Sequence, residues 1–232
     1  MMNIAVIPAR GGSKRIPRKN IKFFHGLPVI AYAIRAAKAS GVIDEVFVST
    51  DDDEIAKISE SFGATIPWMR PKNLSGDYVT TVSVMKDTVI KLKLDSPKIE
   101  NVCCIYPATP LLGPNYLTQG LEVLERGDWS YVISALRANT PPYRFFSLGA
   151  TSQVELLFPE HEEHRTQDLP VAFQDAGQFY WGKESSWALG LPIFSSRSTI
   201  IEIPFKSALD IDTLDDWVYA ERLYSSNRTD LK

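Results

Sequence analysis

Short apolar runs alternate along the chain with longer segments whose apolar residues recur at helical spacing, and this alternation constrains the fold most. Short apolar runs between turn residues predict buried strands, and periodic segments predict helices. The expected strands are Asn3–Ala9, Glu45–Thr50, Asn101–Tyr106, Tyr131–Ala135, Gln178–Trp181 and Ile200–Ile203. The expected helices are 28–39 with Pro28 in its first turn, 52–62, 79–93, a helix marked by Leu117, Leu121 and Leu124, and a final helix capped by Thr213. This order predicts an α/β fold, a mostly parallel sheet with helices on both faces.

The alternation stops over residues 137–170, which contain four prolines, scattered aromatic residues and an acidic run around Glu160–Glu163. It resumes afterwards and continues to the closing helix. We therefore expect one domain over residues 1–232, with an insertion of short strands at about 137–170.

Composition excludes several classes of protein. The formal net charge of −3 lacks the basic excess of a nucleic-acid-binding protein. No run of about 18 apolar residues predicts a membrane span, and the apolar run before Arg10 is too short for a signal peptide. Cys103 and Cys104 are adjacent, so their side chains point to opposite faces of a strand and do not form a disulfide. We expect core thiols, no metal site at these cysteines, and a cytoplasmic protein.

A basic loop directly follows the first expected strand. Residues 10–22 hold six basic side chains and no acidic one. Ligands of open α/β sheets bind beyond the carboxyl ends of the strands, where this loop lies. Gly11 and Gly12 allow the backbone to approach a phosphate. Charge and hydrogen-bond donors come from Arg10, Lys14, Arg15, Arg18 and Lys19. The loop matches neither common phosphate-binding glycine motif. We interpret it as a phosphate site; the alternative is a solvated basic loop.

Two further segments carry candidate ligands. In an extended segment the side chains of Asp210 and Asp212 point to the same face. Two such carboxylates can bind Mg²⁺, with phosphate oxygens and water as its remaining ligands. The alternative is that Asp212 caps the final helix. The stretch 165–180 is rich in Arg, Gln, Asp and aromatic residues, which suits a polyhydroxy ligand, but an ordinary polar loop and strand has the same composition. Its candidate sugar-binding residues are Asp175, Gln178 and Tyr180.

Four segments occur in a family-specific order: IPARGGSKRIPRKN, MRPKNLSGD, RTQDLP and ALDIDTLDDW. The chain resembles the cytidylyltransferases that activate eight- and nine-carbon ulosonic acids, the CMP-sialic acid synthetase family. The resemblance implies a Rossmann-like nucleotidyltransferase fold and a homodimer whose contacts include the insertion at about 137–170. It also implies the conversion of CTP and a sugar acid to a CMP-sugar and pyrophosphate, with Mg²⁺, or Mn²⁺ in its place.

The resemblance also implies roles for individual residues. The nucleotide site is Ala9, Arg10, Gly11, Gly12, Ser13, Lys14, Lys19, Asn20 and Arg70, with Arg10, Ser13 and Lys14 on the triphosphate and Arg70 at the cytosine. Arg165 and Gln167 fall on the sugar-binding segment, and Asp210 and Asp212 match the metal pair. The expected catalytic residues are Arg10, Lys14, Asp210 and Asp212.

Three segments bear on the sugar: CCIYPATP, QDAGQFYWG and DIDTLDDW are similar to the branch of the family that uses pseudaminic acid. Tyr106 stands where sialic acid relatives usually carry Gln, and Ala176-Gly177 where they carry Asn-Gly. N-Acetylneuraminate, legionaminate and 3-deoxy-manno-octulosonate stay open as alternative sugars. A catalytically inactive CTP-binding module is the alternative of a different class; it would have a broken first loop or metal pair.

Overall fold

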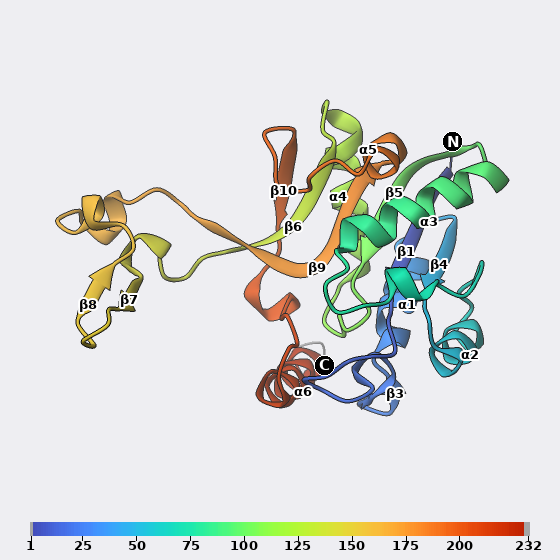
Figure 1. Cartoon of the computed structure of the whole chain (residues 1–232), viewed down its shortest axis with the longest axis horizontal. Coiled ribbons are helices and arrows are strands. Elements are labelled where there is room, and N and C mark those ends of the chain that lie inside the picture. The colour runs from blue at the N-terminus through green and yellow to red at the C-terminus, as the bar shows by residue number, and fades with distance from the viewer. Residues whose placement is uncertain (1, 230–232) are drawn as a thin grey trace.

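The central feature of the protein is a mixed β-sheet, seen in a computed structural model that describes residues 2–229. Within this range six strands pair in the order β10-β6-β9-β5-β1-β4 (Figure 1). They are β1 Met2–Pro8, β4 Glu45–Ser49, β5 Ile99–Ile105, β6 Tyr131–Arg137, β9 Phe173–Lys183 and β10 Ser198–Glu202. Strands β1, β4 and β5 are parallel, as are β6 and β10, whereas β9 runs antiparallel to both β5 and β6.

Helices cover both faces of the sheet, as the sequence predicted. They are α1 Ile30–Ala39, α2 Asp53–Ser61, α3 Thr81–Asp95, α4 Pro114–Arg126, α5 Glu184–Leu189 and α6 Leu214–Thr229. Residues of α1, α2 and α4 share one apolar core with the sheet, and residues of α3 and α5 share the other. Cys103 belongs to the first core and Cys104 to the second; both thiols are free and fully buried, as expected.

One detail of the sequence prediction was wrong and another was incomplete. Pro28 does not open a helix: it belongs to β3 (Leu27–Pro28), which pairs with β2 (Phe23–Phe24), and α1 begins at Ile30. His25 and Gly26 form the turn of this hairpin, both with positive φ, and His25 is not a residue type that signals such a turn. The strand predicted at Gln178–Trp181 is the middle of the much longer β9, whose polar first residues hid it.

A third apolar cluster fixes the basic loop in place. Ile16 of the loop and Phe24 of the hairpin pack against Ile211 and against Trp217 of α6, and all four are almost completely buried. The short 3₁₀ helix Lys19–Ile21 ends the loop. The first and last parts of the chain are thereby held together, which brings the loop near Asp212.

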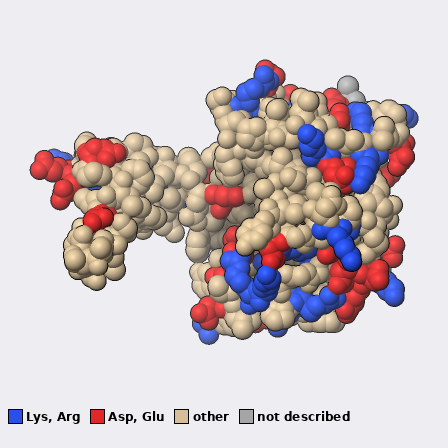
Figure 2. Space-filling model, viewed as in Figure 1, with Lys and Arg blue, Asp and Glu red and all other residues tan. Residues whose placement is uncertain are grey.

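The insertion forms an arm that projects from the body of the molecule (Figure 1). It contains the hairpin of β7 (Phe146–Leu148) and β8 (Val154–Leu156) and three short 3₁₀ helices, so short strands are present as expected. Its exposed apolar side chains are Phe145, Phe146, Leu148, Val154, Leu157 and Val171. Figure 2 shows charged side chains interleaved over the body and an arm that is largely uncharged except near its far end. No helix in the described range is long and apolar enough to cross a membrane.

Candidate active site

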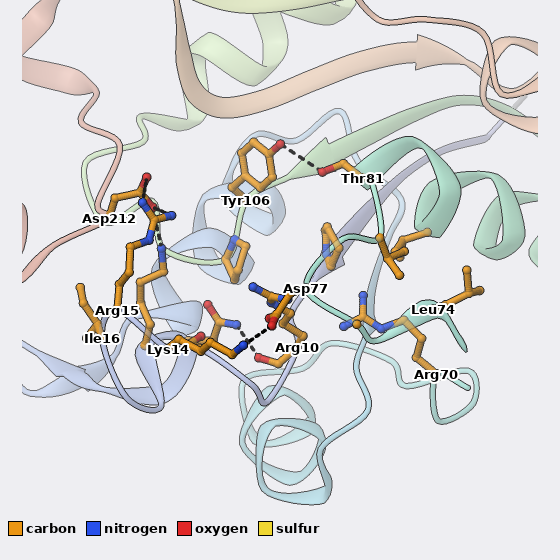
Figure 3. A pocket seen from close by; sticks show the side chains of 18 residues that line it. Arg10, Lys14, Arg15, Ile16, Arg70, Leu74, Asp77, Thr81, Tyr106 and Asp212 are labelled. Atoms are coloured by element: carbon orange, nitrogen blue, oxygen red, sulfur yellow. Dashed lines mark hydrogen bonds and ion pairs between the residues drawn. The ribbon is translucent and has the colours of Figure 1, made fainter. Parts of the chain in front are cut away.

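The carboxyl ends of β1 and β5 border a cleft of about 410 Å³ (Figure 3). This is the edge at which open α/β sheets bind ligands. The first loop, the segment before α3 and the residues after β5 all contribute to the cleft. Among its lining residues are Arg10, Ser13, Lys14, Arg15, Lys19, Asn20, Arg70, Asp77, Thr81, Tyr106 and Asp212.

The cations of the first loop are paired with acidic side chains from other segments. Arg10 Nη1 donates to Asp77 Oδ1 at 2.8 Å, and Lys14 forms an ion pair with the other oxygen of the same carboxylate. Arg15 donates to both carboxylate oxygens of Asp212, at 2.8 Å each. The loop therefore meets carboxylates on two sides of the cleft.

Arg18 and Gly11 connect the loop to the start of α2. Arg18 donates to Asp52 and, at 2.5 Å, to Glu54. The Asp52 carboxylate also caps α2 by accepting from the backbone of Ile55 at 2.9 Å, and the Arg18 hydrogen bond holds the pKa of Asp52 below its usual value. A Cβ on Gly11 would lie 2.7 Å from Asp52 Oδ2, so a larger residue would force the Asp52 side chain to shift.

Asn20 and Arg70 are buried polar residues in the wall of the cleft. Asn20 Nδ2 donates to the Arg10 carbonyl at 2.9 Å, which fixes the loop backbone. Asn20 Oδ1 and the Nε and Nη2 atoms of Arg70 have no hydrogen-bond partner in the part of the chain that the structure describes. Arg70 Nη2 lies 3.6 Å from Asp51, and burial lowers the pKa of its guanidinium. Unpaired buried donors and acceptors are costly unless a ligand pairs with them.

A second pocket of about 290 Å³ adjoins the cleft. Arg15, Lys19, Tyr106, Pro107 and Asp212 line both pockets, while Asp175, Gly177 and Asp210 line only the second. The two pockets therefore meet at Asp212.

Asp210 and Asp212 offer the oxygen ligands that Mg²⁺ prefers. Desolvation and the neighbouring Asp212 charge raise the pKa of Asp210, and the charges of Lys19 and Arg15 offset only part of this rise. Among the described residues no group of three or more His, Cys, Asp or Glu side chains is arranged to hold a metal ion. The pair therefore fits a divalent ion that takes its remaining ligands from phosphate and water.

The capping alternative for Asp212 is not what the structure shows. Thr213 Oγ1 accepts from Asp216 N at 3.2 Å, and the Asp216 carboxylate accepts from Thr213 N at 2.7 Å, a reciprocal cap that begins α6. The Asp212 carboxylate instead faces Arg15 and Lys19.

Tyr106 lines both pockets, and Tyr180 packs against it. The Tyr106 hydroxyl is 3.2 Å from Thr81 Oγ1, and its ring packs edge-on against Tyr180 at 5.6 Å between centroids. Tyr180 in turn donates to Asp175. Burial raises the pKa of both tyrosines, so both hydroxyls are protonated at neutral pH. Since its hydroxyl is occupied by Thr81, Tyr106 presents mainly its ring to the pockets.

The structure gathers most of the sequence candidates, but not all. Asp175 lines the second pocket, and Tyr180 supports it from behind. Gln178 is fully buried, and its amide nitrogen donates to the Ala176 and Leu209 carbonyls, so within one chain it supports the site rather than lining it. Arg165 and Gln167 lie exposed on the arm and line neither pocket. Ala9 is buried behind the loop.

Other side chains at the cleft were not predicted. Asp77 and Thr81 line the cleft and contact the predicted residues Arg10 and Tyr106, and Asp52 pairs with Arg18 of the loop. Asp77 stands inside the segment MRPKNLSGD, but one sequence carries no signal that pairs it with a loop more than 60 residues away.

A family model described as cytidylyltransferase matches residues 4–226. The chain belongs to this family. A pseudaminic acid cytidylyltransferase of Campylobacter jejuni subsp. jejuni serotype O:23/36 (strain 81-176) is 39% identical over 98% of this chain and 98% of its own. An N-acylneuraminate cytidylyltransferase B of Danio rerio is 33% identical over 94% of this chain and 50% of its own.

The fold of this cytidylyltransferase agrees with solved structures. A CMP:2-keto-3-deoxy-manno-octonic acid synthetase complexed with CTP superposes with a TM-score of 0.72 at 15% identity, over 98% of this chain and 100% of the other. The predicted nucleotidyltransferase fold is thereby confirmed, as is the resemblance to the cytidylyltransferase family.

Proposed function

We propose that the chain transfers a cytidylyl group from CTP to pseudaminic acid, giving CMP-pseudaminic acid and pyrophosphate. The observation that carries this proposal is the pair of adjoining pockets, one bordered by the cations of the first loop and the other by Asp175 and Asp210, which meet at Asp212. A nucleotide in the larger pocket and a sugar acid in the smaller one would place their reacting atoms at this junction. The 39% identity with a pseudaminic acid cytidylyltransferase supports the choice of sugar.

The reaction is an in-line displacement at the α-phosphorus. The anomeric hydroxyl forms the new P–O bond and loses its proton, and the bond to pyrophosphate breaks. Negative charge spreads over the phosphate oxygens in the transition state, so positioning and electrostatic stabilisation dominate catalysis. Arg10, Ser13 and Lys14 line the larger pocket and would hold the triphosphate. Mg²⁺, or Mn²⁺ in its place, held by Asp210 and Asp212, would neutralise phosphate charge when bound.

Arg70 is the residue proposed to select the base. Its Nε and Nη2 are buried in the cleft wall, and no described residue accepts a hydrogen bond from them. Two donors match the acceptor edge of cytosine better than the mixed carbonyl and N–H edge of uracil. We therefore expect UTP to be a poor substrate, and equal turnover of CTP and UTP would contradict this role of Arg70.

Tyr106 is the residue proposed to favour pseudaminic acid. Its ring gives the junction an apolar surface, and its hydroxyl is engaged by Thr81. Pseudaminate ends in a methyl group where N-acetylneuraminate ends in a hydroxyl, so it loses less hydration against this ring. We expect kcat/KM to be at least about tenfold higher for pseudaminate than for N-acetylneuraminate.

One assay tests the proposal against its alternatives. Pyrophosphate release from CTP is measured with pseudaminate, N-acetylneuraminate, legionaminate and 3-deoxy-manno-octulosonate in turn. Preference for another sugar would replace the substrate but keep the reaction. Release with none of them, in a protein that binds CTP, would identify an inactive CTP-binding module. The unbroken first loop and the complete Asp210 and Asp212 pair argue against that outcome.

A homodimer in the cytoplasm is the proposed form of the enzyme. The exposed apolar side chains of the arm need a partner surface, and a second copy would use both arms equally. Arg165 and Gln167, which are remote from their own cleft, would then serve the sugar pocket of the partner chain. The free thiols of Cys103 and Cys104 suit a reducing compartment.

A further inference from the structure

Asp77 occupies a place in the cleft that the proposed reaction needs for another anion. Its carboxylate lies between Arg10, 2.8 Å away, and Lys14, with one oxygen directed to each (Figure 3). The Lys14 hydrogen bond and the charges of both cations lower the pKa of Asp77, so the group is a carboxylate at neutral pH. The two cations assigned to the triphosphate thus already hold an anion that belongs to the chain.

The layout of the pockets indicates which part of CTP competes for this place. Arg10 and Lys14 line only the larger pocket, whereas Asp212, Arg15 and Lys19 line both. An in-line attack from the smaller pocket puts the leaving group on the side away from the sugar. The pyrophosphate portion would therefore lie on Arg10 and Lys14, and the α-phosphate near Asp212.

The backbone around Asp77 allows the carboxylate to move aside. Asp77 follows Gly76 and precedes Tyr78, whose side chain is fully exposed, in the connection between the 3₁₀ helix Lys72–Leu74 and α3. Neither neighbour is held in the core. A pyrophosphate group carries more charge and more acceptor oxygens than one carboxylate, so it can take both cations from Asp77.

We propose that Asp77 is an internal counter-ion of the first loop, which competes with the pyrophosphate portion of CTP for Arg10 and Lys14. It lowers the affinity for CTP and, after the reaction, speeds the departure of pyrophosphate by returning to the two cations. The inference rests on the proposed function of the loop as the triphosphate site. It adds a residue that sets how tightly the enzyme holds substrate and product.

Binding of two ligands to one variant tests the inference. Asp77→Asn keeps the shape of the side chain and removes its charge. With calorimetry in Mg²⁺-containing buffer, the Kd of pyrophosphate should fall about 3- to 30-fold, the range that two exposed ion pairs support. The Kd of CMP should stay within about twofold, because its single phosphate would lie at the junction and not on Arg10 and Lys14.

Asp128→Asn is the matched control. Asp128 is paired with Arg197 at 3.1 Å outside both pockets, so the variant changes net charge by the same amount without touching the cleft. It should bind both ligands like the wild type. Asp77→Ser, with a thermal unfolding midpoint for each protein, shows whether a loss of folding accounts for any change.

Several outcomes would overturn the inference. Unchanged or weaker pyrophosphate binding by Asp77→Asn would show that Asp77 does not compete, and equal tightening of CMP and pyrophosphate would show only a general electrostatic effect. Arg10→Ala distinguishes a failure of the counter-ion role of Asp77 from a failure of the loop as the triphosphate site. If Arg10→Ala loses pyrophosphate binding while Asp77→Asn gains none, only the counter-ion role fails. If Arg10→Ala binds pyrophosphate like the wild type, the proposed function of the loop fails as well.

Discussion

The cleft and the arm are built from the same chain but are held in opposite ways. The cleft loop is fixed by buried apolar contacts through Ile16 and Trp217 and by ion pairs to four carboxylates. The arm is a projecting hairpin whose strands are exposed and whose apolar residues face outward. The contacts that fix the cleft loop all come from the same chain, whereas the apolar side chains of the arm stay exposed to solvent.

This difference separates two kinds of residue in the proposed site. Residues of the cleft act from a rigid frame, which catalysis by electrostatic preorganisation requires. In the proposed dimer, residues of the arm such as Arg165 and Gln167 would reach the cleft of the second chain and not their own. Variants of the two regions should therefore fail for different reasons, and four experiments exploit this.

The largest effect is expected in the cleft, for Asp212→Asn. The variant keeps the side-chain shape but removes a charge from the proposed metal pair. Mutation of a residue that only supports a metal ligand lowers metal affinity or activity by about 10–100-fold. Loss of a ligand itself should therefore lower kcat by at least about 100-fold. Metal-titrated kcat and the melting temperature are measured together, and folding should be unchanged.

Thr213→Ala is the matched variant of the next residue. Because Thr213 and Asp216 form the cap of α6, it should lower stability by about 1 kcal/mol and leave kcat nearly normal. The reverse result, an unstable but active Asp212→Asn protein, would return Asp212 to a structural role.

A mixture of two defective chains tests whether the arm acts on a partner. Asp212→Asn removes a proposed metal ligand from the cleft of its chain, and Arg165→Ala removes a proposed sugar contact from the arm of its chain. If each arm serves the partner's cleft, half of the randomly mixed dimers pair the two variants, and each of these holds one intact site. Activity should recover to about a quarter of the wild-type value, a statistical expectation for symmetric dimers. If the arm serves its own cleft, mixing restores nothing. Chains mixed under conditions that prevent subunit exchange are the control.

Alanine substitutions of the adjacent loop residues Gly11 and Gly12 should differ in their effect on stability. A Cβ at Gly11 would meet the Asp52 carboxylate at 2.7 Å, whereas a Cβ at Gly12 would meet no described atom within 4 Å. Gly11→Ala should therefore destabilise the ligand-free protein by about 1–3 kcal/mol, as overpacking does. Gly12→Ala should leave its denaturant midpoint unchanged. Equal midpoints for the two variants would show that the loop is less rigid than its ion pairs indicate.

The smallest effect concerns the pH dependence of the Arg18–Asp52 pair. Asp52→Asn preserves a side chain able to cap α2 but removes the ion pair, and because Arg18 is 41% exposed the expected loss is about 0.5–1 kcal/mol near neutral pH. Arg18 depresses the pKa of Asp52, so this stability is present above the usual aspartate pKa of about 3.9 and is lost as the pH falls through the lower folded-state pKa.

Denaturant titrations at several pH values measure this difference, with Asp53→Asn in the same helical turn as the control. A gap between wild type and Asp52→Asn that stays constant down to the lowest pH would contradict the assignment to the charge of Asp52.

Local patterns predicted most of the fold because strand and helix signals are local. They did not reveal that β9 is antiparallel, since its direction depends on where the arm returns to the sheet. They also missed the hairpin of β2 and β3, where His25 takes a positive φ that is uncommon for a residue other than glycine.

The candidate site was predictable where one short segment contains several of the candidate binding residues. The loop from Ala9 to Asn20 and the pair Asp210 and Asp212 are segments of this kind. The Asp77 and Arg15 ion pairs were not predictable, because each joins segments distant in sequence through tertiary packing. The roles of these residues in catalysis stay predictions until the variants are measured.

The narrow base of the arm has a consequence for how such enzymes diverge. The chain leaves β6 and re-enters β9 at neighbouring points, where Ala138 N donates to the Ala172 carbonyl at 2.9 Å. Everything beyond this hydrogen bond can lengthen, shorten or change in sequence between lineages without moving a strand of the sheet. In the proposed dimer, variation in the arm would therefore be a route to new assemblies and new acceptor sugars that leaves the cleft unchanged.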